Sequence, residues 1–294
     1  MVNLTVQAEE FGQLWHNLLA QLCKERPQSQ PRGMKTRERL SVQLILNKPL
    51  ENILLNSHRN LSYRFMVAEW LWIWFGHDDV ATIARYNPNI AQFSDNGIDF
   101  NGAYGKAIKP HWDRIVSCLT ADPDSRQAVI SIYKAPSAPT KDTPCTLTVQ
   151  WLIRNSQLYT IVNMRSSDIW LGLPYDVFNF TMLTNILSAQ LKLTLGTYVM
   201  NLGSSHLYEK DYDSAKIAMK EKSKTLCSPT IFEPLLLNSS VILERSLMKQ
   251  RKSFNDAKAL VYPWSGYHEV LHAKTNKKAL KFLYDIIKHT SVKR

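Results

Sequence analysis

Residues 147–164, with the sequence LTVQWLIRNSQLYTIVNM, contain the pattern that decides the fold. Large apolar side chains recur at every second position from Leu147 to Ile153, and a second strand-like run, Leu158 to Met164, follows across an Arg-Asn-Ser-Gln turn. A repeat of two indicates a strand with one buried face, and a short polar turn between two such runs is typical of a hairpin. This segment therefore predicts two antiparallel strands.

Helical and strand-like segments alternate irregularly on both sides of this hairpin. The apolar spacing predicts helices over residues 6–24, 62–75, 107–120, 175–191, 209–223 and 277–289. It predicts further strands over residues 39–46, 128–133 and 197–202, with a loop over 87–104. Because no regular strand–helix–strand rhythm is visible, we expect an α+β fold with a mixed or antiparallel sheet packed with helices.

Composition and charge exclude several classes of protein. Of the 294 residues, 45% are hydrophobic and 21% are charged, which excludes a disordered or collagen-like chain. The 36 lysines and arginines exceed the 25 aspartates and glutamates, so the formal net charge is +11. A positive balance favours polyanionic partners, which include nucleic acid, anionic membranes and phosphorylated small molecules.

The cysteines and the N-terminus suggest a cytosolic protein. Cys23, Cys118, Cys145 and Cys227 form no Cys-x-x-Cys pair, so neither a structural zinc site nor a disulfide framework is predicted. No signal peptide is visible at the N-terminus. The longest apolar run is shorter than the roughly 20 residues that a membrane span needs.

Glu69 lies in the most apolar segment of the chain, residues 62–75, SYRFMVAEWLWIWF. A carboxylate in that setting must be paired, protonated or facing a cavity, because burial of an isolated charge is costly. Desolvation would raise its pKa towards neutrality, which suits a general acid or base. The alternative is that Glu69 faces solvent on an exposed stripe of the helix, or is capped by an arginine.

Cys145 follows Pro144 at the start of the predicted hairpin. A nearby cation would lower the pKa of its thiol and make it a nucleophile. Most lone cysteines are simply buried apolar residues, so that alternative stays open.

The run from Met164 to Asp176, MRSSDIWLGLPYD, joins the hairpin to the next helix. Arg165 and Ser166 offer donors suited to a phosphate, because the guanidinium fork matches phosphate oxygens. Gly172 and Pro174 mark a turn before the helix. The alternative is a polar connection between strand and helix.

These motifs together resemble the thymidylate synthase superfamily, over about residues 32–208. The family's nucleophile strand begins Pro-Cys, and its phosphate and folate segment reads Arg-Ser-x-Asp-x-x-Leu-Gly-x-Pro. Its strand-to-helix turn reads Leu-Gly-x-x-His-Leu-Tyr. The matching residues are 144–145, 165–174 and 202–208. Asp-Pro-Asp-Ser-Arg at 122–126 and Tyr-Gly-Lys at 104–106 also match, and the family's buried glutamate falls on Glu69.

The resemblance implies a role for each matched residue. The catalytic residues would be Cys145, Glu69, Tyr104 and Asp176. The residues that hold the nucleotide would be Arg32, Arg126, Arg165, Ser166, Asp176, His206 and Tyr208. The residues that contact the folate would be Asp168, Leu171, Gly172 and Tyr175. Arg126 resembles the arginine that reaches across a homodimer interface to the partner's phosphate, although Gln127 stands where the family has a second arginine.

Asp176 departs from the family and points to cytosine. Thymidylate synthases have Asn at this position, which pairs with O4 and N3–H of uracil. An aspartic acid suits N3 and the 4-amino group of cytosine, and a mismatched base would leave polar groups unpaired. Asp at this position resembles the deoxycytidylate hydroxymethylases of phages and the cytidylate hydroxymethylases of nucleoside antibiotic pathways.

Other departures also favour hydroxymethylation. The family's shielding Trp falls on Ile90, with Phe93 nearby, so water rather than hydride would reach the exocyclic methylene. Thr146 replaces a histidine after the nucleophile. The chain also continues into a basic helical tail, so we expect one thymidylate synthase-like catalytic domain over 1–294 with a divergent C-terminal extension over about 225–294.

The resemblance predicts an enzyme that converts dCMP to 5-hydroxymethyl-dCMP. Its co-substrate would be 5,10-methylenetetrahydrofolate, with water, a covalent bond from Cys145 to C6, and no metal. The alternatives are a CMP hydroxymethylase, a dUMP hydroxymethylase or a thymidylate synthase, and last a catalytically silent protein that binds nucleotide or RNA. We expect a cytoplasmic homodimer, in the host cytoplasm if the protein is viral, without membrane or direct nucleic-acid binding.

Overall fold

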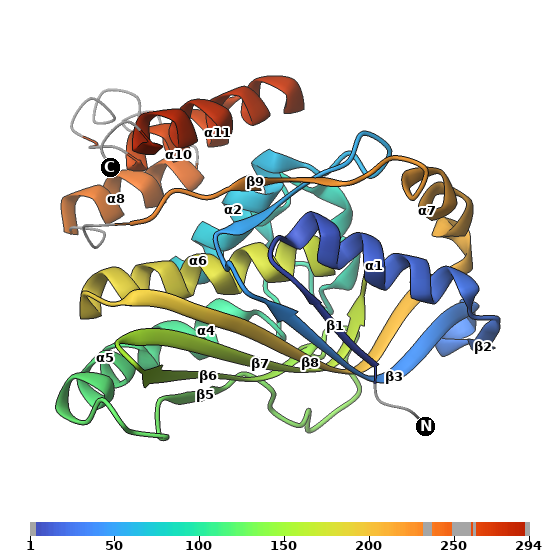
Figure 1. The fold of residues 1–294 in the computed structure, drawn as a ribbon, viewed down its shortest axis with the longest axis horizontal. Coiled ribbons are helices and arrows are strands. Elements are labelled where there is room, and N and C mark those ends of the chain that lie inside the picture. Colours follow the sequence, from blue (N-terminus) through green and yellow to red (C-terminus); the bar gives the residue numbers. More distant parts are fainter. Residues whose placement is uncertain (1–3, 232–236, 249–259, 261–262, 292–294) are drawn as a thin grey trace.

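The computed structural model describes residues 4–231, 237–248, 260 and 263–291, and it consists of a mixed sheet covered on one face by helices (Figure 1). The seven strands of the main sheet are β1 (Leu4–Ala8), β2 (Pro27–Ser29), β3 (Thr36–Leu46), β5 (Val129–Ser131), β6 (Thr146–Arg154), β7 (Gln157–Asp168) and β8 (Thr194–Tyr208). A separate two-stranded sheet pairs β4 (Glu51–Leu55) with β9 (Lys224–Cys227).

The main sheet has the order β1-β3-β8-β7-β6-β5, and β2 pairs with the first two residues of β3. The pairs β1–β3 and β7–β8 are parallel, and the other pairs are antiparallel. The predicted hairpin is confirmed as β6 and β7. Its two turn residues, Asn155 and Ser156, have φ angles of 51° and 59°, as two-residue turns between twisted strands require.

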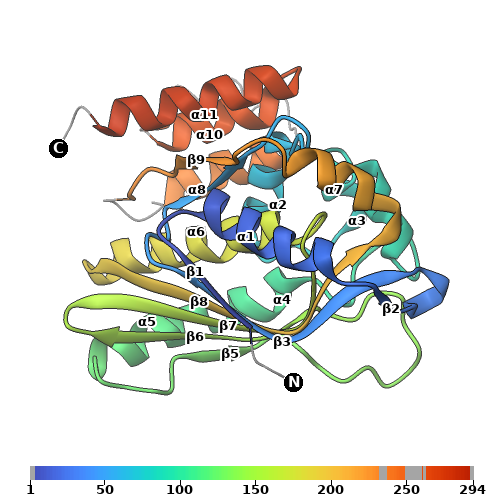
Figure 2. The same ribbon diagram turned by 45° about the vertical axis from the view of Figure 1, so that its right-hand side comes forward.

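The helices lie mainly on one side of the main sheet (Figures 1 and 2). They are α1 (Phe11–Lys24), α2 (Tyr63–Phe75), α3 (Val80–Ile83), α4 (Tyr104–Ile108), α5 (Trp112–Ala121), α6 (Leu173–Leu191), α7 (Tyr212–Ala218), α8 (Leu237–Leu247), α10 (Trp264–His272) and α11 (Asn276–Ser291). Four short 3-10 helices are η1 (Pro31–Gly33), η2 (Pro88–Phe93), η3 (Lys109–His111) and η4 (Glu209–Asp211). Within the described ranges, no helix combines the length and apolar character that a bilayer span requires.

Helix α2 can be apolar nearly all round because other helices pack against it on opposite sides. The Trp70 ring lies 6.0 Å from the Phe178 ring of α6 and 5.0 Å from the Tyr267 ring of α10. Trp70 is 0% exposed. The prediction of a buried helix over 62–75 is therefore confirmed. Helix α10, which precedes α11 near the C-terminus, covers part of its surface.

Four predicted elements were wrong in part. The α-helix expected over 209–223 spans only Tyr212–Ala218. The helix expected over 6–24 begins at Phe11, because Leu4–Ala8 pairs in parallel with β3 as a strand. The helix expected over 107–120 is divided by η3, where Pro110 cannot donate a backbone hydrogen bond. Residues 202–208 do not form a strand-to-helix turn, because β8 continues to Tyr208 with β3 on one side and β7 on the other.

The predicted basic helix near the C-terminus is confirmed as α11, which packs with α10 over α2 as an outer layer (Figure 2). Parts of the expected extension over 225–294 lie outside the described residues, at 232–236, 249–259, 261–262 and 292–294. The division of the chain into a catalytic domain and an extension stays a prediction.

Candidate active site

The parallel pairing of β7 with β8 brings two of the sequence motifs side by side. Ser166 is paired with Ser204, and Asp168 is paired with His206. A Cβ atom on Gly203 would lie 2.8 Å from the carbonyl oxygen of Arg165. Only glycine therefore lets the two backbones approach this closely.

Cys145 lies next to this pair of strands, immediately before β6. The Arg165 backbone N–H donates to the Cys145 carbonyl at 2.9 Å. Burial raises the pKa of the half-buried thiol, and the guanidinium of Arg165 and a hydrogen bond from Ser166 oppose that rise. The structure thus brings the predicted nucleophile and the predicted phosphate-binding residues together.

The Arg165 guanidinium is held in place by backbone carbonyls. Its Nε donates to Pro144 at 2.9 Å and its Nη2 donates to Thr143 at 2.8 Å. The side chain is exposed, so its position suits an anionic ligand.

Arg32 lies in η1, which joins β2 to β3, on the side of β8 opposite β7. Its φ of 52° is in the left-handed region, which a non-glycine residue adopts at a cost in free energy. Its Nη2 donates to the Tyr208 hydroxyl at 3.4 Å, and its charge also acts on Cys145. Arg32 and Arg165 therefore form the cationic side of the site, with the Tyr208 hydroxyl beside Arg32.

Asp168 and His206 form a close pair at the ends of β7 and β8. Asp168 Oδ1 accepts from the backbone N–H groups of Trp170 and Leu171, both at 2.9 Å. Burial raises the pKa of Asp168 and lowers the pKa of His206, so the imidazole is favoured in its neutral form. The His206 ring lies 5.2 Å from the Tyr208 ring.

Glu69 meets α6 through an amide that the sequence analysis did not single out. Asn179 Nδ2 donates to Glu69 Oε2 at 2.8 Å. Burial raises the pKa of Glu69 to about 7, and the bond from Asn179 opposes that rise. In the part of the chain that the structure describes, no arginine or lysine forms an ion pair with Glu69, so the arginine-capped alternative is wrong there.

Asp176 lies in the first turn of α6 and is partly accessible. Burial raises its pKa well above the usual range, and Glu69 and Asp168 add to the rise. Burial therefore favours the neutral form of its carboxyl. A neutral carboxyl has one donor and one acceptor oxygen, and the proton can sit on either. It can match cytosine or uracil, so the preference for cytosine stays a prediction.

Tyr104 of α4 lies in a cluster with the other three predicted catalytic residues, Cys145, Glu69 and Asp176. Its ring stacks on Phe180 of α6 at 5.8 Å. Burial raises the pKa of its phenol well above the usual value, and Asp176, Cys145 and Glu69 are all close enough to add to the rise. The four predicted catalytic residues thus lie close to one another.

The predicted folate residues lie between the end of β7 and the first turn of α6. Leu171 is 43% exposed, and Gly172 begins α6. The Tyr175 hydroxyl accepts from the Ser62 N–H at 3.1 Å. Arg59, which the sequence analysis missed, lies 5.4 Å from the Trp170 ring and adds a cation to this side. Its signal in the sequence was only a basic residue in the loop before α2.

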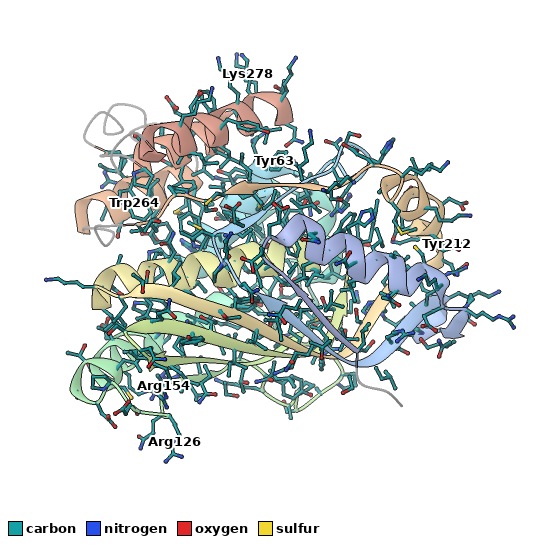
Figure 3. All side chains as sticks on the ribbon, in the orientation of Figure 1. Tyr63, Arg126, Arg154, Tyr212, Trp264 and Lys278 are labelled. Carbon is teal, nitrogen blue, oxygen red and sulfur yellow. The ribbon has the colours of Figure 1, made fainter. Side chains whose placement is uncertain are left out.

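Arg126 is not brought to the cluster within this chain. It lies on the outer end of the sheet, near Arg154, and points outward (Figure 3). Ile90 packs against the core from η2, and Phe93 is 44% exposed. Among the described contacts, neither residue touches Cys145 or Glu69, so their role as a substitute for the family's tryptophan stays a prediction.

Several buried polar atoms around the cluster have no hydrogen-bond partner among the described residues: Ser167 Oγ, Asn179 Oδ1, Tyr198 Oη and Ser205 Oγ. Buried polar atoms are normally paired, so these residues suit a polar ligand and ordered water. The arrangement combines a thiol, a general base, a neutral acid and an anion site. That set can perform nucleophilic addition to an electron-poor ring in a phosphorylated molecule.

Known proteins share this sequence pattern. Residues 13–238 match the family described as thymidylate synthase. A deoxyuridylate hydroxymethyltransferase of Bacillus phage SP01 is 32% identical over 234 residues, which cover 72% of this chain and 61% of that protein. The match thus spans about three fifths of the length of this curated relative.

Proposed function

The chain belongs to the thymidylate synthase family, and from that premise we propose that it hydroxymethylates a pyrimidine nucleoside monophosphate at C5. 5,10-Methylenetetrahydrofolate supplies the one-carbon unit at the oxidation level of formaldehyde, so hydration gives CH₂OH without a reductant. The observation that carries the proposal is the cluster of Cys145, Asp176, Tyr104 and Glu69, with Glu69 held at a pKa of about 7.

Cys145 starts the reaction. Its sulfur bonds to C6 of the ring, which makes C5 nucleophilic towards the one-carbon unit. Arg165 stabilises the thiolate that attacks. C5 then bonds to the methylene carbon and loses its proton, and the bond from that carbon to tetrahydrofolate breaks, so that tetrahydrofolate leaves and an exocyclic methylene stays on C5. After hydroxide has added to this methylene, elimination of the Cys145 sulfur from C6 completes the cycle and regenerates the aromatic ring.

Glu69 is the base that generates the hydroxymethyl group. Because its pKa is about 7, it is ionised in a useful fraction of molecules at neutral pH and can accept a proton from water. The resulting hydroxide adds to the methylene carbon on C5. We assign the relay of a proton to Tyr104, because its phenol interacts with both Glu69 and Cys145.

The phosphate is held by Arg165, Ser166 and Arg32, while His206 and Tyr208 contact the sugar. Arg126 completes the site of a partner subunit in a homodimer. An apolar row on the sheet supports this assembly: Ile45 is paired with Val199, which is paired with Ile161, and all three are partly exposed. Their chain neighbours Leu44, Met200 and Val162 are buried in the core instead.

Cytosine and uracil are both candidates for the pyrimidine base of the substrate. Asp176 supports dCMP as the first candidate, with CMP as a ribose alternative. The relative from Bacillus phage SP01 is named for deoxyuridylate and favours dUMP as the second candidate. A neutral Asp176 is compatible with both bases. A virus-encoded enzyme acting in the host cytoplasm on precursors of modified DNA is the setting we propose.

One experiment separates these candidates. The protein is incubated with 5,10-methylenetetrahydrofolate and dCMP, CMP or dUMP in parallel, and each nucleotide is analysed by mass spectrometry. Addition of CH₂O to dCMP is the expected result. Addition of CH₂ would identify a thymidylate synthase, CH₂O on dUMP would move the assignment to uracil, and no tritium release from C5 of any nucleotide would favour the catalytically silent protein.

A further inference from the structure

We propose that Asn179 is the positioning residue for Glu69, and that its one amide group orients both the Glu69 carboxylate and the water that this carboxylate deprotonates. This inference rests on the proposed hydroxymethylation and names how the chain directs its last step. Asn179 lies between Phe178 and Phe180 in a helix most of whose residues are buried.

The first contact holds the base. Asn179 is 1% exposed, and its Nδ2 donates to Glu69 Oε2 at 2.8 Å across the α2–α6 interface. Among the described residues, Asn179 is the hydrogen-bond partner of the Glu69 side chain. Because both helices are packed in the core, the bond fixes the direction in which the other carboxylate oxygen points.

The second contact is available for water. The Oδ1 atom of Asn179 is buried and has no partner among the described residues. An amide that donates through Nδ2 presents this oxygen on its other side, where it can accept a hydrogen bond. A water that donated to Oδ1 would lie near the Glu69 carboxylate, where a base must remove its proton.

The charges around Glu69 explain why a neutral donor is needed. The ionisable groups that face it are Asp176 and Tyr175 of α6 and Tyr104 of α4, and each would repel a carboxylate if it were ionised. Burial also disfavours the anion. The Asn179 amide is the group that favours the anionic, basic form without adding a charge.

The test compares the pH dependence of hydroxymethyl product formation in the wild type and in Asn179→Ala. Loss of a hydrogen bond to a charged group should move the acidic limb of kcat to higher pH by about one to two units. The KM for the nucleotide should change by less than about threefold, since Asn179 is not placed on the phosphate or the sugar.

Asn185→Ala is the matched control on the same helix. Asn185 is also a buried amide, and it bonds to the backbone of Pro229 and Ile231 rather than to Glu69. Asn185→Ala should lower the melting temperature, while the acidic limb of its kcat profile stays at the wild-type pH. An equal shift of the limb in Asn185→Ala and Asn179→Ala would show that Asn179 acts only through general stability and would overturn the inference.

A double-mutant cycle supplies a second readout that survives if Asn179→Ala is poorly stable. In a Glu69→Gln background, removal of the Asn179 amide should reduce residual product formation by less than about twofold, because the base that it orients is already gone. Full additivity of the two substitutions would overturn the inference. If the wild type releases tritium from C5 but forms no CH₂OH product, the proposed function fails instead, and the two failures are distinguishable.

Discussion

At the scale of single residues, the reactivity of Cys145 depends on the charges that lie beside it. Burial alone would keep the thiol protonated, and Arg165 is the main group that favours the thiolate. The sequence predicted the nucleophile from its place after a proline and from the resemblance. It could not predict the balance between burial and charge, because Arg165 is twenty residues away and reaches Cys145 through strand pairing.

Replacement of Cys145 by Ala should abolish covalent catalysis. We expect turnover to fall by at least about 10³-fold, because C5 is not activated without addition to C6. Tritium release from C5 measures the loss. Nucleotide binding, measured by calorimetry, should be retained because the phosphate contacts are unchanged. An active Cys145→Ala enzyme would remove the covalent scheme.

Glu69 should make the protein less stable as the pH rises. Its pKa is about 7 in the folded protein against an ordinary value of 4.5, so the folded state holds the proton more tightly than the unfolded state does. The associated stability is therefore complete below about pH 4.5 and is lost as the pH rises to about 7. Glu69→Gln should raise the free energy of unfolding by about 2 kcal/mol at pH 8, and by less than about 1 kcal/mol at pH 5.

Urea unfolding at the two pH values measures this difference. Gln can still accept the hydrogen bond from Asn179, so the contact between the helices is kept. Glu269→Gln, at an exposed position of α10, is the control and should change the free energy equally at both pH values. If the free energy of unfolding of Glu69→Gln exceeds that of the wild type by no more at pH 8 than at pH 5, Glu69 is not desolvated.

At the scale of elements, the length of β8 decides where the site forms. The apolar pattern predicted only residues 197–202, because Gly203, Ser204 and Ser205 carry no strand signal. In the structure these residues are held between β3 and β7, so the strand extends to Tyr208. Pairing on both sides thus overrides weak local propensity, and it carries His206 and Tyr208 to the phosphate-binding residues.

Gly203→Ala should separate β7 from β8 at this point. The new methyl group would meet the Arg165 carbonyl oxygen, which is backbone and cannot rotate away. We expect a loss of about 1–3 kcal/mol in the free energy of unfolding and a weaker affinity for the nucleotide. Thermal unfolding and calorimetry measure the two effects.

Gly196→Ala is the control on the same strand. There the methyl group would meet the Tyr159 ring, a side chain that can move. Stability should fall less than in Gly203→Ala, and nucleotide affinity should not change. Unchanged nucleotide affinity in Gly203→Ala would show that the spacing of β7 and β8 does not shape the phosphate site.

At the scale of the whole molecule, Arg126 lies apart from the cluster that its motif predicts. It points outward from one end of the sheet (Figure 3), while the apolar row of Ile45, Val199 and Ile161 is partly exposed on the sheet. A homodimer through this face would cover the row and give each site an arginine from the partner.

Subunit mixing tests this assembly. Arg126→Ala and Cys145→Ala proteins should each be nearly inactive alone. After denaturation and refolding together, mixed dimers should contain one complete site, with Cys145 from one chain and Arg126 from the other. We therefore expect recovery of up to about a quarter of wild-type activity when the chains mix at random. No recovery, together with a monomeric mass by light scattering, would contradict the shared site.

The sequence by itself determined the strands and helices with strong apolar periodicity, among them the β6–β7 hairpin, α2 and α6. It also indicated the identities of the reactive residues, since motif spacing is local information. Only the tertiary structure decided that Leu4–Ala8 is a strand, that β8 reaches Tyr208, and that Asn179 meets Glu69. These features depend on pairing and packing between residues far apart in the chain, and the same packing removes water from Glu69 and Asp176 and so changes their proton affinities.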